Sequence, residues 1–127
     1  GNWTRHKDYM ARANDEIGLI VQIESREALD QLDAICRVPG VDAVFIGPSD
    51  LAAALGRRGQ AAHPEVQAAI SQAIRTARAA GKAVGTLAAD NKAEGYLEQG
   101  ATMVGVGTDL HLLVAAAAAL RARFPSS

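Results

Sequence analysis

Two carboxylate side chains stand where neighbouring predicted strands end. Glu24 directly follows an apolar segment at residues 17–23, and Asp50 comes shortly after a second one at 43–46. Parallel strands in α/β folds end at the same edge of the sheet, and ligands bind there. Two carboxylates that leave coordination positions open are typical of Mg²⁺ or Mn²⁺ sites. A divalent cation held in this way can chelate a 2-oxo acid through its carboxylate and keto oxygens.

Helix capping is the competing interpretation of these carboxylates. A better capping residue, Ser25, comes directly after the first of them, and Asp50 falls just inside a predicted helix start. The turn at Gly47 and Pro48 favours the metal site, because glycine lets the backbone approach a ligand closely and proline stiffens the turn. The backbone N–H groups of Ser49 and Asp50 would then face the same edge as anion donors.

The lysines give no support to Schiff-base chemistry. Lys82 and Lys92, the two lysines after the first predicted strand, do not fall at the carboxyl end of a strand, and Lys82 lies at a strand start. A metal that stabilises an enolate removes the need for an imine-forming lysine. The sequence therefore favours metal-assisted over covalent amine catalysis.

The elements that must position these residues alternate along the chain. Short apolar segments bounded by turn residues predict buried strands at residues 17–23, 43–46, 83–87 and 103–106. Their continuous apolar character is typical of parallel strands covered on both faces. Helical patterns lie at about residues 25–37, 64–80, 92–99 and 109–124, and another precedes the first strand at 8–14. Strict alternation predicts right-handed βαβ units in an α/β fold with a parallel sheet.

Composition excludes several classes of function. The chain has 127 residues, 49% hydrophobic and 21% charged, which suits a globular domain. A net charge of -1 and 4% aromatic residues give no basis for nucleic-acid binding. No segment has the length and apolar character of a membrane span, so we expect no membrane association and a cytoplasmic location. The single Cys36 is expected to be a reduced, buried thiol.

The N-terminus lacks an initiator methionine and the apolar core of a signal peptide. We therefore expect the chain to begin within a longer gene product.

Several motifs together closely resemble the class II pyruvate aldolases of the HpcH/HpaI aldolase/citrate lyase family. The resemblance rests on the strings VQIES at 21–25, VFIGPSDL at 44–51, LG at 55–56, HPEVQ at 63–67, GKA at 81–83 and VGVGTD at 104–109. Trp3 and the segment at 8–14 resemble the helix that precedes the fifth strand in these enzymes. The similarity covers nearly the whole chain, and the combination of motifs is specific.

The resemblance implies a fold and a set of site residues. It implies that residues 1–127 form a single partial domain, the C-terminal half of a (β/α)8 TIM barrel with strands five to eight. It implies that Glu24 and Asp50 bind the divalent metal, which could be Mg²⁺, Mn²⁺ or Co²⁺. Gln22 would lie beside the metal, and the backbone at Gly47, Pro48 and Ser49 would receive the pyruvyl carboxylate, as substrate-binding residues.

The implied reaction is reversible cleavage of a 4-hydroxy-2-oxo acid to pyruvate, or a similar 2-oxo acid, and an aldehyde through a metal-stabilised enolate. Members of the family usually assemble as hexamers that exchange the last helix between subunits. The apolar residues Leu112, Leu113, Ala116 and Leu120 suit such a contact, so we expect a homo-oligomer.

The sequence departs from the family pattern in its length, because a full barrel takes about 250 residues. The strands that carry the family's acid–base histidine and arginine have no counterpart here, so the catalytic acid–base residues are unassigned. His6, His63 and His111 do not match those roles. We expect the isolated half to be inactive. The alternative is a non-catalytic half-barrel that binds a metal or an oxo acid, or only assembles with a partner and so covers its strand edges.

Overall fold

The computed structural model describes residues 5–88 and 92–124. Its elements, in chain order, are α1 (Tyr9–Glu16), β1 (Ile20–Ile23), α2 (Arg26–Asp30), α3 (Leu32–Cys36), β2 (Ala43–Ile46), α4 (Pro48–Ala54), α5 (Pro64–Ala79), β3 (Ala83–Leu87), α6 (Ala93–Glu98), β4 (Met103–Gly105) and α7 (Asp109–Arg121). The predicted alternation of strands and helices is therefore confirmed.

The four strands form one parallel sheet in the order β1-β2-β3-β4. The register aligns Ile23 of β1 with Ile46 of β2 and Thr86 of β3. Because all strands run in the same direction, their carboxyl ends lie at one edge of the sheet. The residues that follow the strands are brought together there.

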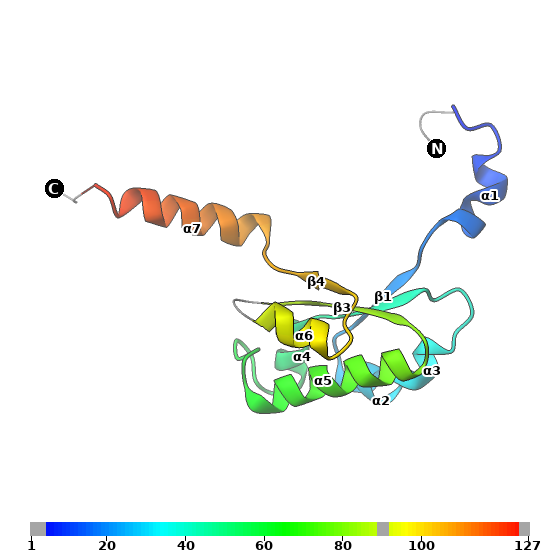
Figure 1. Ribbon diagram of the computed structural model, residues 1–127, viewed down its shortest axis with the longest axis horizontal. Helices are drawn as coiled ribbons and strands as arrows, with labels where there is room; N and C mark the ends of the chain where they lie inside the picture. Colours follow the sequence, from blue (N-terminus) through cyan, green and yellow to red (C-terminus); the bar gives the residue numbers. More distant parts are fainter. Residues whose placement is uncertain (1–4, 89–91, 125–127) are drawn as a thin grey trace.

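Helices α2 to α6 lie on one face of this sheet (Figure 1). The side chains that point toward them from the strands form most of the buried core, together with the inner faces of α3 and α5. Thr86 is the buried polar member, and its hydroxyl donates to the carbonyl oxygen of Ile46 at 3.1 Å. This bond satisfies the hydroxyl without water, as burial requires.

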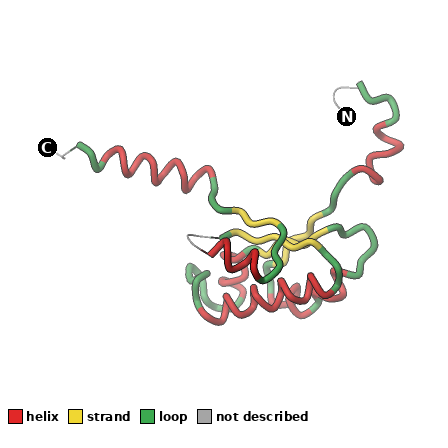
Figure 2. Tube along the Cα trace, viewed as in Figure 1, coloured by secondary structure: helices red, strands yellow, loops and turns green. Residues whose placement is uncertain are grey.

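The opposite face of the sheet is not covered by the residues that the structure describes, which corrects the expectation of strands covered on both faces. Ile20 and Met103, which the register places on that face, are 48% and 42% exposed. Helix α1 and helix α7 extend away from the sheet, as Figure 2 shows, and neither contributes a buried residue. The apolar strand sequences thus indicate that a second layer covers this face, and the described residues do not supply it.

The structure also differs from several of the predicted helix and strand bounds. Residues 25–37, predicted as one helix, form α2 and α3 with a turn at Gln31 between them. The first strand begins at Ile20 rather than at residue 17, although the Leu19 carbonyl accepts from the amides of Asp42 and Ala43. The last strand ends at Gly105.

Local signals are otherwise placed as predicted. The Ser25 hydroxyl accepts from the amide of Ala28 and so caps α2. Pro64 is the first residue of α5, and Gly81, with φ +77°, follows that helix in the left-handed conformation that glycine adopts at low cost. Cys36 is buried, and that burial raises the pKa of its thiol. None of the helices within the described ranges is long and apolar enough to cross a membrane.

Candidate metal- and substrate-binding edge

Three of the predicted site residues meet at the carboxyl edge of β1 and β2. Gln22 and Glu24 are two positions apart and lie on the same side of the chain, where the Gln22 amide donates to Glu24 Oε1 at 2.7 Å. Gly47 follows β2, and its backbone lies directly against the Glu24 side chain. A Cβ added at Gly47 would lie only 2.3 Å from Glu24 Oε1 and 2.8 Å from its Cγ. The close approach expected of this glycine is therefore made to the Glu24 carboxylate.

This geometry shows that Glu24 does not cap the helix that follows it. The cap of α2 is the Ser25 hydroxyl, so the Glu24 carboxylate is not used for that purpose. Glu24 is half-buried, and its Oε1 is held by Gln22 from the uncovered face of the sheet. The structure therefore fixes Glu24 at the edge in a defined position without giving it a capping role.

Pro48, Ser49 and Asp50 form the first turn of α4, next to Gly47. Gly47 is the N-terminal cap residue and provides no side-chain acceptor, and the Asp50 side chain is exposed within the first turn. The first backbone N–H groups of a helix have no partner within the helix, so those of Ser49 and Asp50 can serve an anion.

The donor set at this edge fits a hard divalent cation. Glu24 and Asp50 follow neighbouring strands and supply carboxylate oxygens, which Mg²⁺ and Mn²⁺ prefer. Within the described ranges, no group of three or more His, Cys, Asp or Glu side chains is placed to hold a metal. A cation bound by Glu24 and Asp50 would keep coordination positions for water and substrate.

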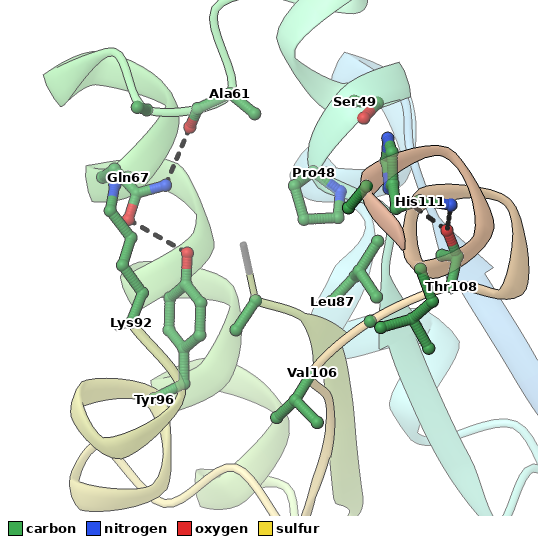
Figure 3. A pocket seen from close by; sticks show the side chains of 15 residues that line it. Pro48, Ser49, Ala61, Gln67, Leu87, Lys92, Tyr96, Val106, Thr108 and His111 are labelled. Carbon is green, nitrogen blue, oxygen red and sulfur yellow. Dashed lines mark hydrogen bonds between the residues drawn. The ribbon is translucent and has the colours of Figure 1, made fainter. Parts of the chain in front are cut away.

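A cavity of about 490 Å³ lies beside this edge, between the carboxyl ends of β3 and β4 and the starts of α4 and α7 (Figure 3). Pro48 and Ser49 form part of its wall, and Leu87 and Val106 contribute apolar surface. Among the polar residues on this wall, the sequence predicted a role for Ser49 but not for Gln67, Lys92, Tyr96 or Thr108. Lys92 and Thr108 come shortly after the third and fourth strands, and this position is the signal that could have identified them.

The three histidines have roles other than contact with Gln22, Glu24 or Gly47. The His63 Nδ1 accepts from the amide of Glu65 at 3.2 Å and caps α5. His111, at the start of α7, contacts the Thr108 hydroxyl through its Nδ1 at 3.1 Å and lines the cavity. His6 lies in an exposed turn before α1. The structure thus gives His63 a capping role at the start of α5.

A parallel α/β sheet with helices on one face and carboxylates at its carboxyl edge is the architecture of part of a TIM barrel with its active-site edge. A sequence model of the family described as HpcH/HpaI aldolase/citrate lyase matches residues 2–116. The chain belongs to this family.

Named relatives and solved structures agree with this assignment. A 4-hydroxy-2-oxo-heptane-1,7-dioate aldolase from Shigella flexneri is 55% identical over 98% of this chain and 47% of its own length. A hydroxypyruvate/pyruvate aldolase from Cupriavidus necator is 52% identical over 96% of this chain and 46% of its own length. The crystal structure of a family protein from Burkholderia cenocepacia has a TM-score of 0.84 and 38% identity, and covers 94% of this chain and 48% of that one.

The HpcH/HpaI aldolase from Desulfitobacterium hafniense superposes with a TM-score of 0.76 at 33% identity, covering 99% of this chain and 49% of that one. The chain therefore spans about half the length of the relatives that it matches, and its four strands correspond to half of a TIM-barrel aldolase.

Proposed function

We propose that this chain is the metal- and substrate-binding half of a divalent-metal-dependent aldolase that cleaves 4-hydroxy-2-oxo acids to pyruvate, or a similar 2-oxo acid, and an aldehyde. The contact of Gln22, Glu24 and Gly47 at the carboxyl edge carries the proposal, because it holds a carboxylate where a cation and a small anion could meet. The aldolase names of the relatives support the reaction class.

Each residue of this edge has a separate task in the proposal. Glu24 and Asp50 would hold the cation, and Gln22 would orient Glu24 through its amide. The backbone N–H groups of Ser49 and Asp50, which follow Pro48 in the first turn of α4, would bind the carboxylate of the 2-oxo acid. The Leu87 side chain would exclude water from one side of the bound acid, since it lines the adjoining cavity. A bound divalent cation would supply Lewis-acid stabilisation of the negative charge on the keto oxygen.

The reaction balances without a redox partner. Cleavage breaks the bond between C3 and C4, the 4-hydroxyl loses its proton as the aldehyde forms, and the electron pair of the bond passes to the 2-oxo acid fragment. A proton added at C3 then completes pyruvate. The family resemblance assigns the proton transfers to residues outside this chain, so Gln22, Glu24 and Asp50 would bind and orient rather than move protons.

One observation favours a second candidate, a half-barrel whose role is assembly. The uncovered sheet face carries the exposed Ile20 and Met103, and α7 carries Leu112 and Leu113 at 67% and 69% exposure. Apolar surface of this kind marks protein contacts. Pairing through the uncovered face, or assembly into a homo-oligomer through α7, would bury it.

The test uses the full product of the gene, treated with chelator and then reloaded with Mg²⁺ or Mn²⁺. Pyruvate released from a 4-hydroxy-2-oxo acid is measured with a coupled dehydrogenase. We expect metal-dependent turnover that falls at least about 100-fold in Glu24→Gln and in Asp50→Asn, since each removes a ligand charge. Asp30→Asn, which removes an exposed carboxylate on α2, is the matched control and should keep full activity. Absence of turnover with every divalent metal would leave only the assembly role.

A further inference from the structure

A hydroxyl group is buried in the core next to the carboxyl edge of the sheet. Thr86 lies in β3, and its relative exposure is 0%. The register places it beside Ile46 of β2 and, one strand further, in line with Ile23 of β1. A β-branched residue suits a strand, but valine would fill the same space without a buried polar atom that needs a partner. Packing alone therefore does not account for the hydroxyl.

The hydroxyl holds one peptide group, the one that joins Ile46 to Gly47. Thr86 Oγ1 donates to the carbonyl oxygen of Ile46 at 3.1 Å. On the opposite side of β2, the amide of Gly47 donates to the carbonyl oxygen of Ile23 at 3.3 Å. The peptide group is therefore anchored to β3 through its oxygen and to β1 through its nitrogen. Its plane cannot rotate without lengthening at least one of these hydrogen bonds.

This peptide group leads directly to the metal- and substrate-binding edge. Gly47 lies against the Glu24 side chain, where an added Cβ would be 2.3 Å from Oε1. The carbonyl that receives the Gly47 amide belongs to Ile23, the residue before Glu24. Gly47 also begins α4, because its carbonyl accepts from the Leu51 amide at 3.0 Å, and that helix carries Asp50 in its first turn. A shift at Gly47 would therefore change the positions of both proposed metal ligands.

We propose that Thr86 is a positioning residue for the bound metal. Its hydroxyl, through the peptide group after β2, sets the orientation of Glu24 and Asp50 relative to each other. This inference rests on the proposed function, because it takes these two carboxylates as the ligands of the cation. Thr86 is buried on the face of the sheet that the helices cover, whereas Glu24 alternates with Ile23 onto the other face. Thr86 thus acts through the backbone and not by contact with the substrate.

Two substitutions at Thr86 separate positioning from packing. Thr86→Val keeps the shape of the side chain and removes the hydroxyl, whereas Thr86→Ser keeps the hydroxyl and removes a buried methyl group. The measurement is a Mn²⁺ titration of the chelator-treated full product of the gene. In Thr86→Val we expect the Kd for Mn²⁺ to rise about three- to tenfold, the effect of one lost hydrogen bond. In Thr86→Ser the Kd should stay within about twofold of its original value, because the hydrogen bond is kept.

Val84→Ala is the matched control for damage to the core. Val84 lies in the same strand, two residues before Thr86, and is buried on the same face but nearer the start of the strand. Its truncation should lower the thermal midpoint and leave the Kd for Mn²⁺ unchanged. An unchanged Kd in Thr86→Val would overturn the positioning role. So would a rise of equal size in Thr86→Ser or in Val84→Ala.

A measurement without metal tests the same contact. Hydrogen–deuterium exchange is read at the Gly47 amide by fragmentation of the peptide that spans residues 44–51. In Thr86→Val we expect this amide to exchange about three- to tenfold faster than in the unaltered protein, and in Thr86→Ser at the original rate. Equal exchange in Thr86→Val and the unaltered protein would overturn the proposal. If the unaltered protein does not bind Mn²⁺, the proposed function fails, and the exchange comparison alone decides whether Thr86 positions this turn.

Discussion

Gly47→Ala should displace the Glu24 carboxylate without unfolding the protein. The new methyl carbon would start 2.3 Å from Glu24 Oε1 and 2.9 Å from its carboxyl carbon. Ordinary contact requires a retreat of about 1 Å. A retreat of that size breaks or lengthens the 2.7 Å hydrogen bond from Gln22, which is the group that holds Glu24 in place.

The expected consequence is a loss of metal affinity. Residues that position a ligand typically change affinity or activity by about 10–100-fold when they are altered, so we expect a Kd for Mn²⁺ raised by that factor. The assay is a Mn²⁺ titration of the chelator-treated full gene product, with circular dichroism to verify that the variant is folded. The effect is measured without any substrate.

Two further variants separate positioning from general damage. In Gly95→Ala, in α6, the added carbon has nothing within 4 Å apart from its chain neighbours and its own helix backbone, so it should leave Mn²⁺ binding unchanged and slightly raise stability. In a Glu24→Asp background, the shorter side chain has to retreat less from the added methyl group. Gly47→Ala should therefore raise the Kd for Mn²⁺ by a smaller factor in that background than in the unaltered protein. Unchanged Mn²⁺ affinity in Gly47→Ala, or an equal loss in both backgrounds, would refute the positioning argument.

Three other predictions follow from burial and exposure. Cys36 is buried and the pKa of its thiol is raised by that burial, so it should react with an aromatic disulfide reagent at pH 8 only after denaturant is added. Because the folded chain holds the Cys36 proton more tightly than the unfolded chain, the thiol's contribution to the free energy of unfolding is full below about pH 8.5 and declines as the pH rises through the folded pKa. The denaturant concentration at the unfolding midpoint should therefore decrease as the pH rises above this value, and an unchanged midpoint would contradict the prediction. Leu113→Asp, on the exposed α7, should lower the assembled mass measured by sedimentation while leaving the circular dichroism of the protein unchanged. An unaltered mass for an oligomeric protein would remove α7 from the interface.

Much of the scaffold could be predicted from local residue patterns. Ser25 caps a helix because its hydroxyl can reach an amide three residues ahead, a contact that depends only on nearby chain. Residues Val66, Ile70, Ala73, Ile74 and Ala77 are all buried along one face of α5, as their spacing indicates. The parallel sheet follows from strict alternation, and the family followed from motifs that span nearly the whole chain.

The break at Gln31 and the uncovered face of the sheet were not predictable in the same way. A helical pattern continues through Gln31 without a proline or glycine, so nothing local marks the end of α2 there. Apolar strands predict that both faces are buried, but the pattern does not state which chain supplies the second layer. Ile20 and Met103 show that the described residues do not supply it.

The sequence alone determined which side chains reach the carboxyl edge, because the residue after each parallel strand must lie there. It placed Glu24 and Asp50 at neighbouring strand ends, and also Gly47 beside the second. Only the tertiary structure decided that Gly47 lies against the Glu24 carboxylate and that Lys92 shares a cavity wall with Gln67. Such contacts join residues far apart in the chain, and they depend on strand register and helix packing, which no local pattern of residues encodes.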